Sequence, residues 1–186
     1  MTKPTLLAPA PSLIEPAHVF TTFKSLCIDT AARADEPSRA ALSDGFEEVE
    51  TFALPMRGTG LVLESERRFR REGFLLTLSA HRPAEDEGPP RRLRMARLLA
   101  APVDYQAAKK EFDAHLGAPN KIDPRRIAAG YVSIDGGALA QSPEDAAERF
   151  ARGQGDLVDI SIDVFLRSRR DPPTTFAATY ARWRTI

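Results

Sequence analysis

The sequence predicts an α+β domain: an antiparallel sheet of about five to seven strands with helices packed on one face, in two layers. Segments of alternating apolar residues follow one another through short turns, which favours antiparallel pairing. Segments with apolar residues at helical spacing stand before and between these strands. The clearest strand, 156–167, alternates apolar and polar side chains, as a strand with one buried face does.

The chain is predicted to begin with an extended arm and to continue as a single α+β domain over residues 17–186. The arm, residues 1–16, contains four prolines, each of which fixes φ and removes a backbone donor. The first helix is predicted from residue 17, with an apolar face formed by Val19, Phe20, Phe23, Leu26 and Cys27. A second short helix over 37–44 is predicted to end at Gly45.

A hairpin is predicted next, with strands over 60–69 and 73–81. In its second strand Phe74, Leu76, Leu78 and Ala80 share one face. Asp104 and Ser142 are each placed to cap a following helix. The other predicted elements are a strand within 46–54, a polar loop over 83–90, a strand over 91–101, a helix over 104–116, a strand over 126–134, a helix over 142–153, and a closing pair of strands over 156–167 and 174–184.

Composition excludes several classes of protein. Lys+Arg and Asp+Glu number 26 each, so there is no overall positive field to attract nucleic acid or an anionic membrane. No apolar run approaches the length of about 18 residues that a membrane span requires. Cys27 is the one cysteine, and the first residues lack the apolar core of a secretory signal, so we expect a cytoplasmic protein unless a cleaved segment precedes this sequence.

No catalytic or phosphate-binding motif is recognisable, such as G-x-x-x-x-G-K-[ST], G-x-S-x-G or H-E-x-x-H. The three histidines lie in different predicted elements without a second ligand nearby, so we predict no metal and no cofactor. The leading hypothesis is a non-enzymatic binding or protein-interaction module, chaperone-like or ligand-binding, with a second copy or another protein as partner. The alternative is a small hydrolase- or lyase-like enzyme whose site combines His81 with carboxylates.

The candidate binding residues lie near the closing pair of strands. Asp159 and Asp163 share the polar face of the 156–167 strand, and Arg182 and Arg184 are expected across the hairpin from them. His81 ends a strand beside a loop and completes the candidate set. The hypothesis is a polar groove on the open face of the sheet, and the alternative is a charged ladder that only faces water.

Arginines gather in three groups, at 67–71, 91–97 and 167–170. If adjacent, they would form a basic face that holds phosphates, but acids flank the first two groups and few aromatics lie among them. We therefore predict cross-strand ion pairs and no nucleic-acid binding. Cys27 lies on the apolar face of the first helix, which predicts a buried and unreactive thiol.

Residues 16–35, PAHVFTTFKSLCIDTAARAD, resemble the opening helix of small uncharacterised bacterial proteins with a Phe-x-x-x-Cys motif, here Phe23 and Cys27. The second cysteine of that group is missing from this chain, and the resemblance implies a bacterial protein without assigning an activity or a site. The order of helix, meander, helix and hairpin also resembles that of small chaperone-like proteins.

Overall fold

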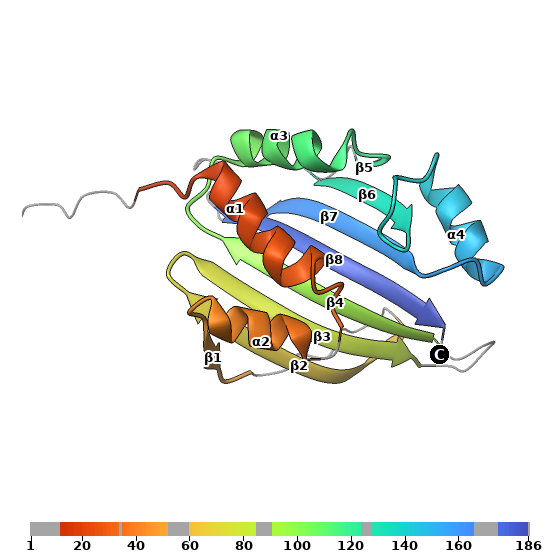
Figure 1. The fold of residues 1–186 in the computed structure, drawn as a ribbon, viewed down its shortest axis with the longest axis horizontal. Helices are drawn as coiled ribbons and strands as arrows, with labels where there is room; N and C mark the ends of the chain where they lie inside the picture. The colour runs from red at the N-terminus through yellow and green to blue at the C-terminus, as the bar shows by residue number, and fades with distance from the viewer. Residues whose placement is uncertain are drawn as a thin grey trace, which may run out of the picture.

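The computed structural model describes residues 12–33, 35–51, 60–84, 91–123, 128–165 and 175–185, which form one antiparallel sheet with helices (Figure 1). The described helices are α1 (Pro16–Phe23), the π-helical turn η1 (Lys24–Ile28), α2 (Glu36–Ser43), α3 (Tyr105–Leu116) and α4 (Pro143–Ala151). The described strands are β1 (Glu47–Val49), β2 (Leu61–Arg71), β3 (Phe74–Pro83), β4 (Arg91–Ala100), β5 (Lys121–Asp123), β6 (Ala128–Ile134), β7 (Leu157–Phe165) and β8 (Thr175–Thr185).

The eight described strands run in the order β1-β2-β3-β4-β8-β7-β6-β5, and each pair of neighbours is antiparallel. The α+β class and the antiparallel sheet are therefore confirmed. The strand number slightly exceeds the predicted range because β5 has three residues, which is too short to show an alternating pattern. The predicted strand within 46–54 shortens to β1, and residues 52–59 lie outside the described part.

The core lies between one face of the sheet and the N-terminal helices. Phe176, Ala178 and Tyr180 of β8 alternate into it. On β7, Val158, Ile160 and Ile162 are buried as predicted, Val164 packs against the core, and Asp159, Ser161 and Asp163 are only half-buried on the opposite face. The predicted face of β3 is also confirmed, because Phe74, Leu76 and Leu78 contact the same cluster.

Helices α1, η1 and α3 supply buried aromatic and apolar side chains to this cluster, including Phe20, Phe23 and Phe112. Figure 1 shows α1 and α2 in front of the sheet. The buried residues of α4, Ala146 and Phe150, are not part of the cluster, and α4 contacts β6 and β7. The prediction that every helix packs on one face is therefore not confirmed.

Two helix starts follow the predicted capping chemistry. The Asp104 side chain accepts a hydrogen bond from the Ala107 amide at 3.1 Å, and Ser142 accepts one from the Asp145 amide at 3.1 Å. Both bonds satisfy amides that the first helical turn leaves unpaired. The predicted arm lies outside the described residues up to position 11, as do the loop residues 85–90. Across the part of the chain that the structure describes, we find no helix long and apolar enough to span a bilayer.

Candidate functional site

Four arginines face one another across β4 and β8. Arg92 pairs in register with Arg184, and Arg94 pairs with Arg182. These positions continue the alternation that sends Ala96, Leu98 and Ala100 into the core, so the four side chains lie on the helix-bearing face. Directly opposed like charges destabilise a strand pair, by an amount on the order of 0.2–1 kcal/mol. The arrangement therefore favours a negatively charged partner.

Two carboxylates neutralise part of this charge. The Asp156 Oδ2 atom accepts hydrogen bonds from Arg182 Nε at 2.8 Å and contacts Nη2 at 2.6 Å, while Arg184 Nε lies 3.7 Å away. The Glu64 Oε2 atom lies 3.0 Å from Arg92 Nε. Among the described residues, no ion pair engages Arg94. The four arginines are thus only half compensated.

A fifth arginine, Arg33, reaches the same place from the turn that follows η1. Ala31 and Ala32 precede it with φ of 48° and 49°, a left-handed conformation that alanine seldom adopts. Each such residue stores strain on the order of 1 kcal/mol, and strained residues of this kind cluster at functional sites. The strained turn therefore marks the backbone next to Arg33 as a candidate functional position.

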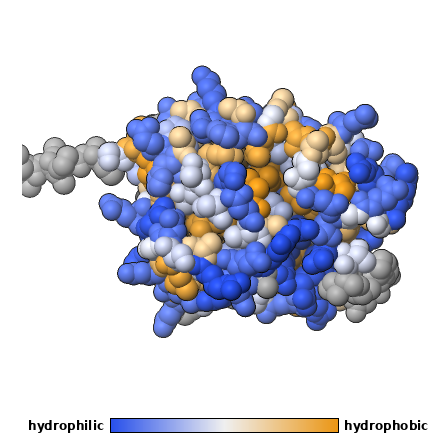
Figure 2. Space-filling model, in the orientation of Figure 1, coloured by the Kyte–Doolittle hydropathy of each residue, from blue (hydrophilic) through white to orange (hydrophobic). Residues whose placement is uncertain are grey.

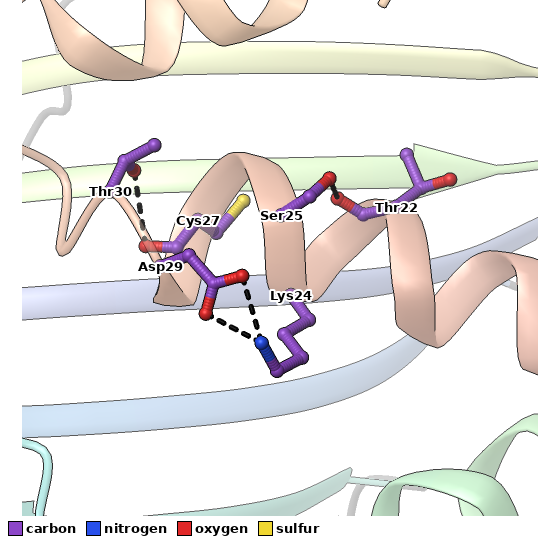
Figure 3. A network of polar contacts seen from close by, with 6 residues as sticks. All are labelled: Thr22, Lys24, Ser25, Cys27, Asp29 and Thr30. Carbon is purple, nitrogen blue, oxygen red and sulfur yellow. Dashed lines mark hydrogen bonds and ion pairs between the residues drawn. The ribbon is translucent and has the colours of Figure 1, made fainter.

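Side-chain bonds around η1 fix the approach to this turn (Figure 3). Lys24 Nζ donates to both carboxylate oxygens of Asp29, at 2.7 and 2.8 Å. The Thr30 hydroxyl donates to the Leu26 carbonyl at 2.8 Å and lies 3.4 Å from the Cys27 carbonyl, which is the contact that Figure 3 draws. These bonds tie Asp29 and Thr30, which follow η1, to residues within η1. Arg33 consequently starts from a fixed backbone.

The five arginines surround one cavity of about 350 Å³, which we call the arginine cavity. It is lined by Ala31, Ala32, Arg33, Arg92, Arg94, Arg182, Arg184 and Thr185. Five guanidinium groups and the two carboxylates paired with them leave a local excess of three positive charges. Figure 2 shows deep blue, strongly hydrophilic surface on the face that carries α1 and α2.

The side chains that line this cavity are of the kind that binds anions. A guanidinium group stays charged at every physiological pH and presents a planar fork of N–H donors, which matches two oxygens of a phosphate or carboxylate. Several forks around one space can satisfy several oxygens of one ligand. Within the described residues, no group of three or more His, Cys, Asp or Glu side chains is placed to hold a metal ion.

The structure separates the predicted site residues into two sets. Arg182 and Arg184 line the arginine cavity, whereas Asp159 and Asp163 lie on the other face of the sheet. The expected cross-hairpin approach does not occur, because Asp159 is in register with Ala181 and Asp163 with Ala177. Arginine at an even position and aspartate at an odd one consequently point to opposite faces.

His81 lies on the same face as Asp159, in register with Leu93 of β4. It is 3% exposed, its Nε2 atom is 2.9 Å from the Ser79 hydroxyl, and its Nδ1 atom has no hydrogen-bond partner. Burial lowers the pKa of His81, and the negative charges of Glu66 and Glu64 oppose that shift. His81 lines neither the arginine cavity nor the cavities beside it.

Asp159 and Cys27 have clear structural surroundings. The Asp159 Oδ2 atom accepts a hydrogen bond from Lys121 Nζ at 2.7 Å. The predicted burial of Cys27 is confirmed, since its side chain is fully enclosed and desolvation raises the pKa of the thiol far above its ordinary value. A thiol in this state is a packing group.

Sequence reasoning did not identify Arg33, Arg92 and Arg94 as parts of one site. The useful signal was the alternation of side chains along a strand. On β4 and on β8 the even-numbered residues face the core, and these arginines occupy even-numbered positions of the same stripe. Charged residues are almost never fully buried unless they are paired, so arginines in this stripe mark a place where the core ends. The turn that precedes Arg33 could not be predicted from the sequence, because alanine rarely adopts the positive φ that Ala31 and Ala32 have.

Comparison of the chain with family models, with curated proteins and with solved structures finds no match.

Proposed function

We propose that this protein is a non-enzymatic binding protein that holds a small anionic ligand, carrying phosphate or carboxylate groups, in the arginine cavity. The observation that supports the proposal most directly is the pair of opposed arginines, Arg92 with Arg184 and Arg94 with Arg182. Their mutual repulsion destabilises the empty protein, and an anion between them converts that repulsion into attraction.

The surroundings of the cavity support the same conclusion. Arg94 and Arg33 form no ion pair within the described part of the chain, so their donors are available to a ligand. The volume of about 350 Å³ falls within the range of small-molecule pockets, roughly 300–1,000 Å³. The binding role retains the sequence-based predictions of a cytoplasmic bacterial protein that has itself or another protein as partner and does not bind nucleic acid.

Thermal unfolding with added inorganic phosphate, pyrophosphate and citrate tests the proposal. A ligand present at one hundred times its Kd stabilises the folded state by about 2.7 kcal/mol, which raises the Tm of a protein of this size by about 5–11 °C. We expect this shift for at least one of the three anions, saturating with concentration. Isothermal titration calorimetry then gives the stoichiometry, for which we expect one ligand per chain.

Arg94→Gln and Arg70→Gln form a matched pair of variants for this test. Both remove one positive charge, but Arg70 lies on β2, in register with Leu75 and away from the arginine cavity. We expect Arg94→Gln to abolish most of the anion-induced shift and Arg70→Gln to preserve it. Equal responses of the two variants, or no saturable shift with any of the anions, would contradict the proposed function.

A further inference from the structure

A second cavity, of about 550 Å³, opens beside the arginine cavity. The two cavities share Ala31, Arg33 and Arg182 in their linings, so they are adjoining parts of one depression. The second cavity lies between the helix-bearing face of β6, β7 and β8, the turn after η1, the end of α3 and the loop 135–139. A ligand bound at Arg33 and Arg182 therefore has room to extend into it.

The accessible surface of this second cavity is more polar than apolar. At its floor Val158, Ile160, Tyr131 and Tyr180 are almost fully covered, each with at most 7% of its surface exposed. Apart from the two tyrosines, the side chains with polar groups in the lining are Asp29, Arg33, His115, Ser133, Asp135 and Arg182. We call the cavity with this lining the polar compartment.

Ser133 places an unpaired hydroxyl group in the polar compartment. It lies on β6 in register with Val158, a core residue, so its side chain is on the helix-bearing face of the sheet. Ser133 is 4% exposed, and none of the residues that the structure describes forms a hydrogen bond with its hydroxyl. Buried polar groups without a partner are rare because each one costs free energy. A hydroxyl in this position is therefore available to a group that enters the compartment.

His115 adds a hydrogen-bond acceptor to the same lining. Its Nδ1 atom lies 2.9 Å from the Glu111 carbonyl oxygen, which can only accept, so Nδ1 carries the proton. The Nε2 atom of the neutral ring is consequently an acceptor, and it has no hydrogen-bond partner in the described part of the chain. The ring stacks on Phe20 with the centroids 4.2 Å apart, which holds its plane.

The charges around the compartment favour a hydroxyl group over an ammonium group. Both carboxylate oxygens of Asp29 already accept hydrogen bonds from Lys24 (Figure 3). Arg33 and Arg182 stand on the wall shared with the arginine cavity, where they repel a cation that enters beside an anionic head. A hydroxyl group is uncharged and both donates and accepts, so it suits Ser133 and the imidazole acceptor alike.

We propose that the ligand is a hydroxylated anion, a phosphate or carboxylate of a sugar or polyol, whose head lies among the arginines and whose hydroxyl groups occupy the polar compartment. This inference rests on the proposed function, because it assigns the head to the same arginine cavity. The head sits near Arg33 and Arg182, which line both cavities, and one hydroxyl group bonds to Ser133.

Pairs of ligands with equal carbon number test the inference. The pairs are propyl phosphate with glycerol 3-phosphate, hexyl phosphate with sorbitol 6-phosphate, and hexanoate with gluconate, and Kd is measured by isothermal titration calorimetry. One net hydrogen bond between uncharged groups tightens binding about 2- to 12-fold. With bonds to Ser133 and His115, we expect sorbitol 6-phosphate to bind at least fivefold tighter than hexyl phosphate, and gluconate to exceed hexanoate in the same way.

Ser133→Ala and Ser161→Ala form the matched pair of variants. Both remove one hydroxyl group from the sheet, but Ser161 lies on the opposite face, in register with Gly130 and Thr179. We expect Ser133→Ala to weaken sorbitol 6-phosphate about 2- to 12-fold and to leave inorganic and hexyl phosphate within twofold. Ser161→Ala should leave all three unchanged. Arg94→Gln should weaken every phosphate by a similar factor, because it acts on the head alone.

The outcomes distinguish this inference from the proposed function. If the hydroxylated member of each pair binds no tighter than its alkyl partner, or if the two serine variants respond equally, the inference is wrong, while the arginine cavity remains an anion site. Tighter binding of phosphoethanolamine than of glycerol 3-phosphate would also overturn it, since the compartment would then take a cation. If no phosphate or carboxylate binds at all, the proposed function itself fails. The comparison of ligand pairs on the wild-type protein needs no variant to fold.

Discussion

Replacement of Ile162 by alanine tests the register on which the sheet, and hence the arginine cavity, depends. The side chain is fully buried, and its register partners on β6 and β8 are Ala129 and Ala178. Loss of three methyl or methylene groups at about 0.8 kcal/mol each removes roughly 2.4 kcal/mol. Because both cross-strand neighbours are small, they have no side chain long enough to refill the space, so the cavity term brings the expected loss to about 3–5 kcal/mol.

The assay is urea unfolding followed by far-ultraviolet circular dichroism, with thermal unfolding as a second measure. At about 2–4 °C per kcal/mol, the Tm of Ile162→Ala should fall by about 6–20 °C. The matched control is Ser161→Ala, whose half-buried side chain lies on the opposite face, in register with Gly130 and Thr179. We expect the control to change the free energy of unfolding by less than about 1 kcal/mol. Equal losses for the two variants would refute the register, because a slip by one residue exchanges the two faces.

Three further predictions concern other parts of the molecule. Cys27 should react with a thiol reagent only after denaturant is added, and rapid labelling of the native protein would show that the site opens. Because burial lowers the pKa of His81, the unfolded chain binds the proton more readily, and the free energy of unfolding should decrease as the pH falls below about 6.5. His81→Gln should flatten that dependence in a urea series between pH 5 and pH 8, and an unchanged slope would assign it to other groups. Binding to generic single- and double-stranded RNA or DNA should be absent at physiological salt, whereas micromolar binding that Arg92→Gln and Arg94→Gln abolish would contradict this expectation.

Much of the fold was predictable because local chemistry specifies it. The alternation of β7 fixes which side chains are buried, and Asp104 and Ser142 mark helix starts by satisfying free amides. The turn at Gly73 likewise follows from a φ of 73°, which glycine adopts without strain. Each of these features depends on neighbours a few residues away.

The site was less predictable because it depends on pairing between distant segments. In the sequence, Arg92 and Arg94 belong to an ordinary run of charged residues. Only the register of β4 with β8 shows that they lie opposite Arg184 and Arg182. The same register sends Asp159 and Asp163 to the other face, away from the arginines expected opposite them. The pattern within one strand shows which of its residues share a face of the sheet. Which residues of another strand lie on that same face follows only from the pairing of the two strands.

The position of β8 within the sheet also governs when the molecule can be completed. Ala100 pairs with Phe176 and Arg91 with Thr185, so partners across β4 and β8 stand 76 to 94 positions apart along the chain. At a synthesis rate of about 5–20 residues per second, β4 waits roughly 4–19 s on the ribosome for its second neighbour. During that interval its outer backbone groups are an open edge, to which another nascent chain can add. Four of the five cavity arginines come from β4 and β8. While β4 is unpaired, repulsion between its arginines and those of a second copy disfavours pairing of β4 with the same strand of another chain.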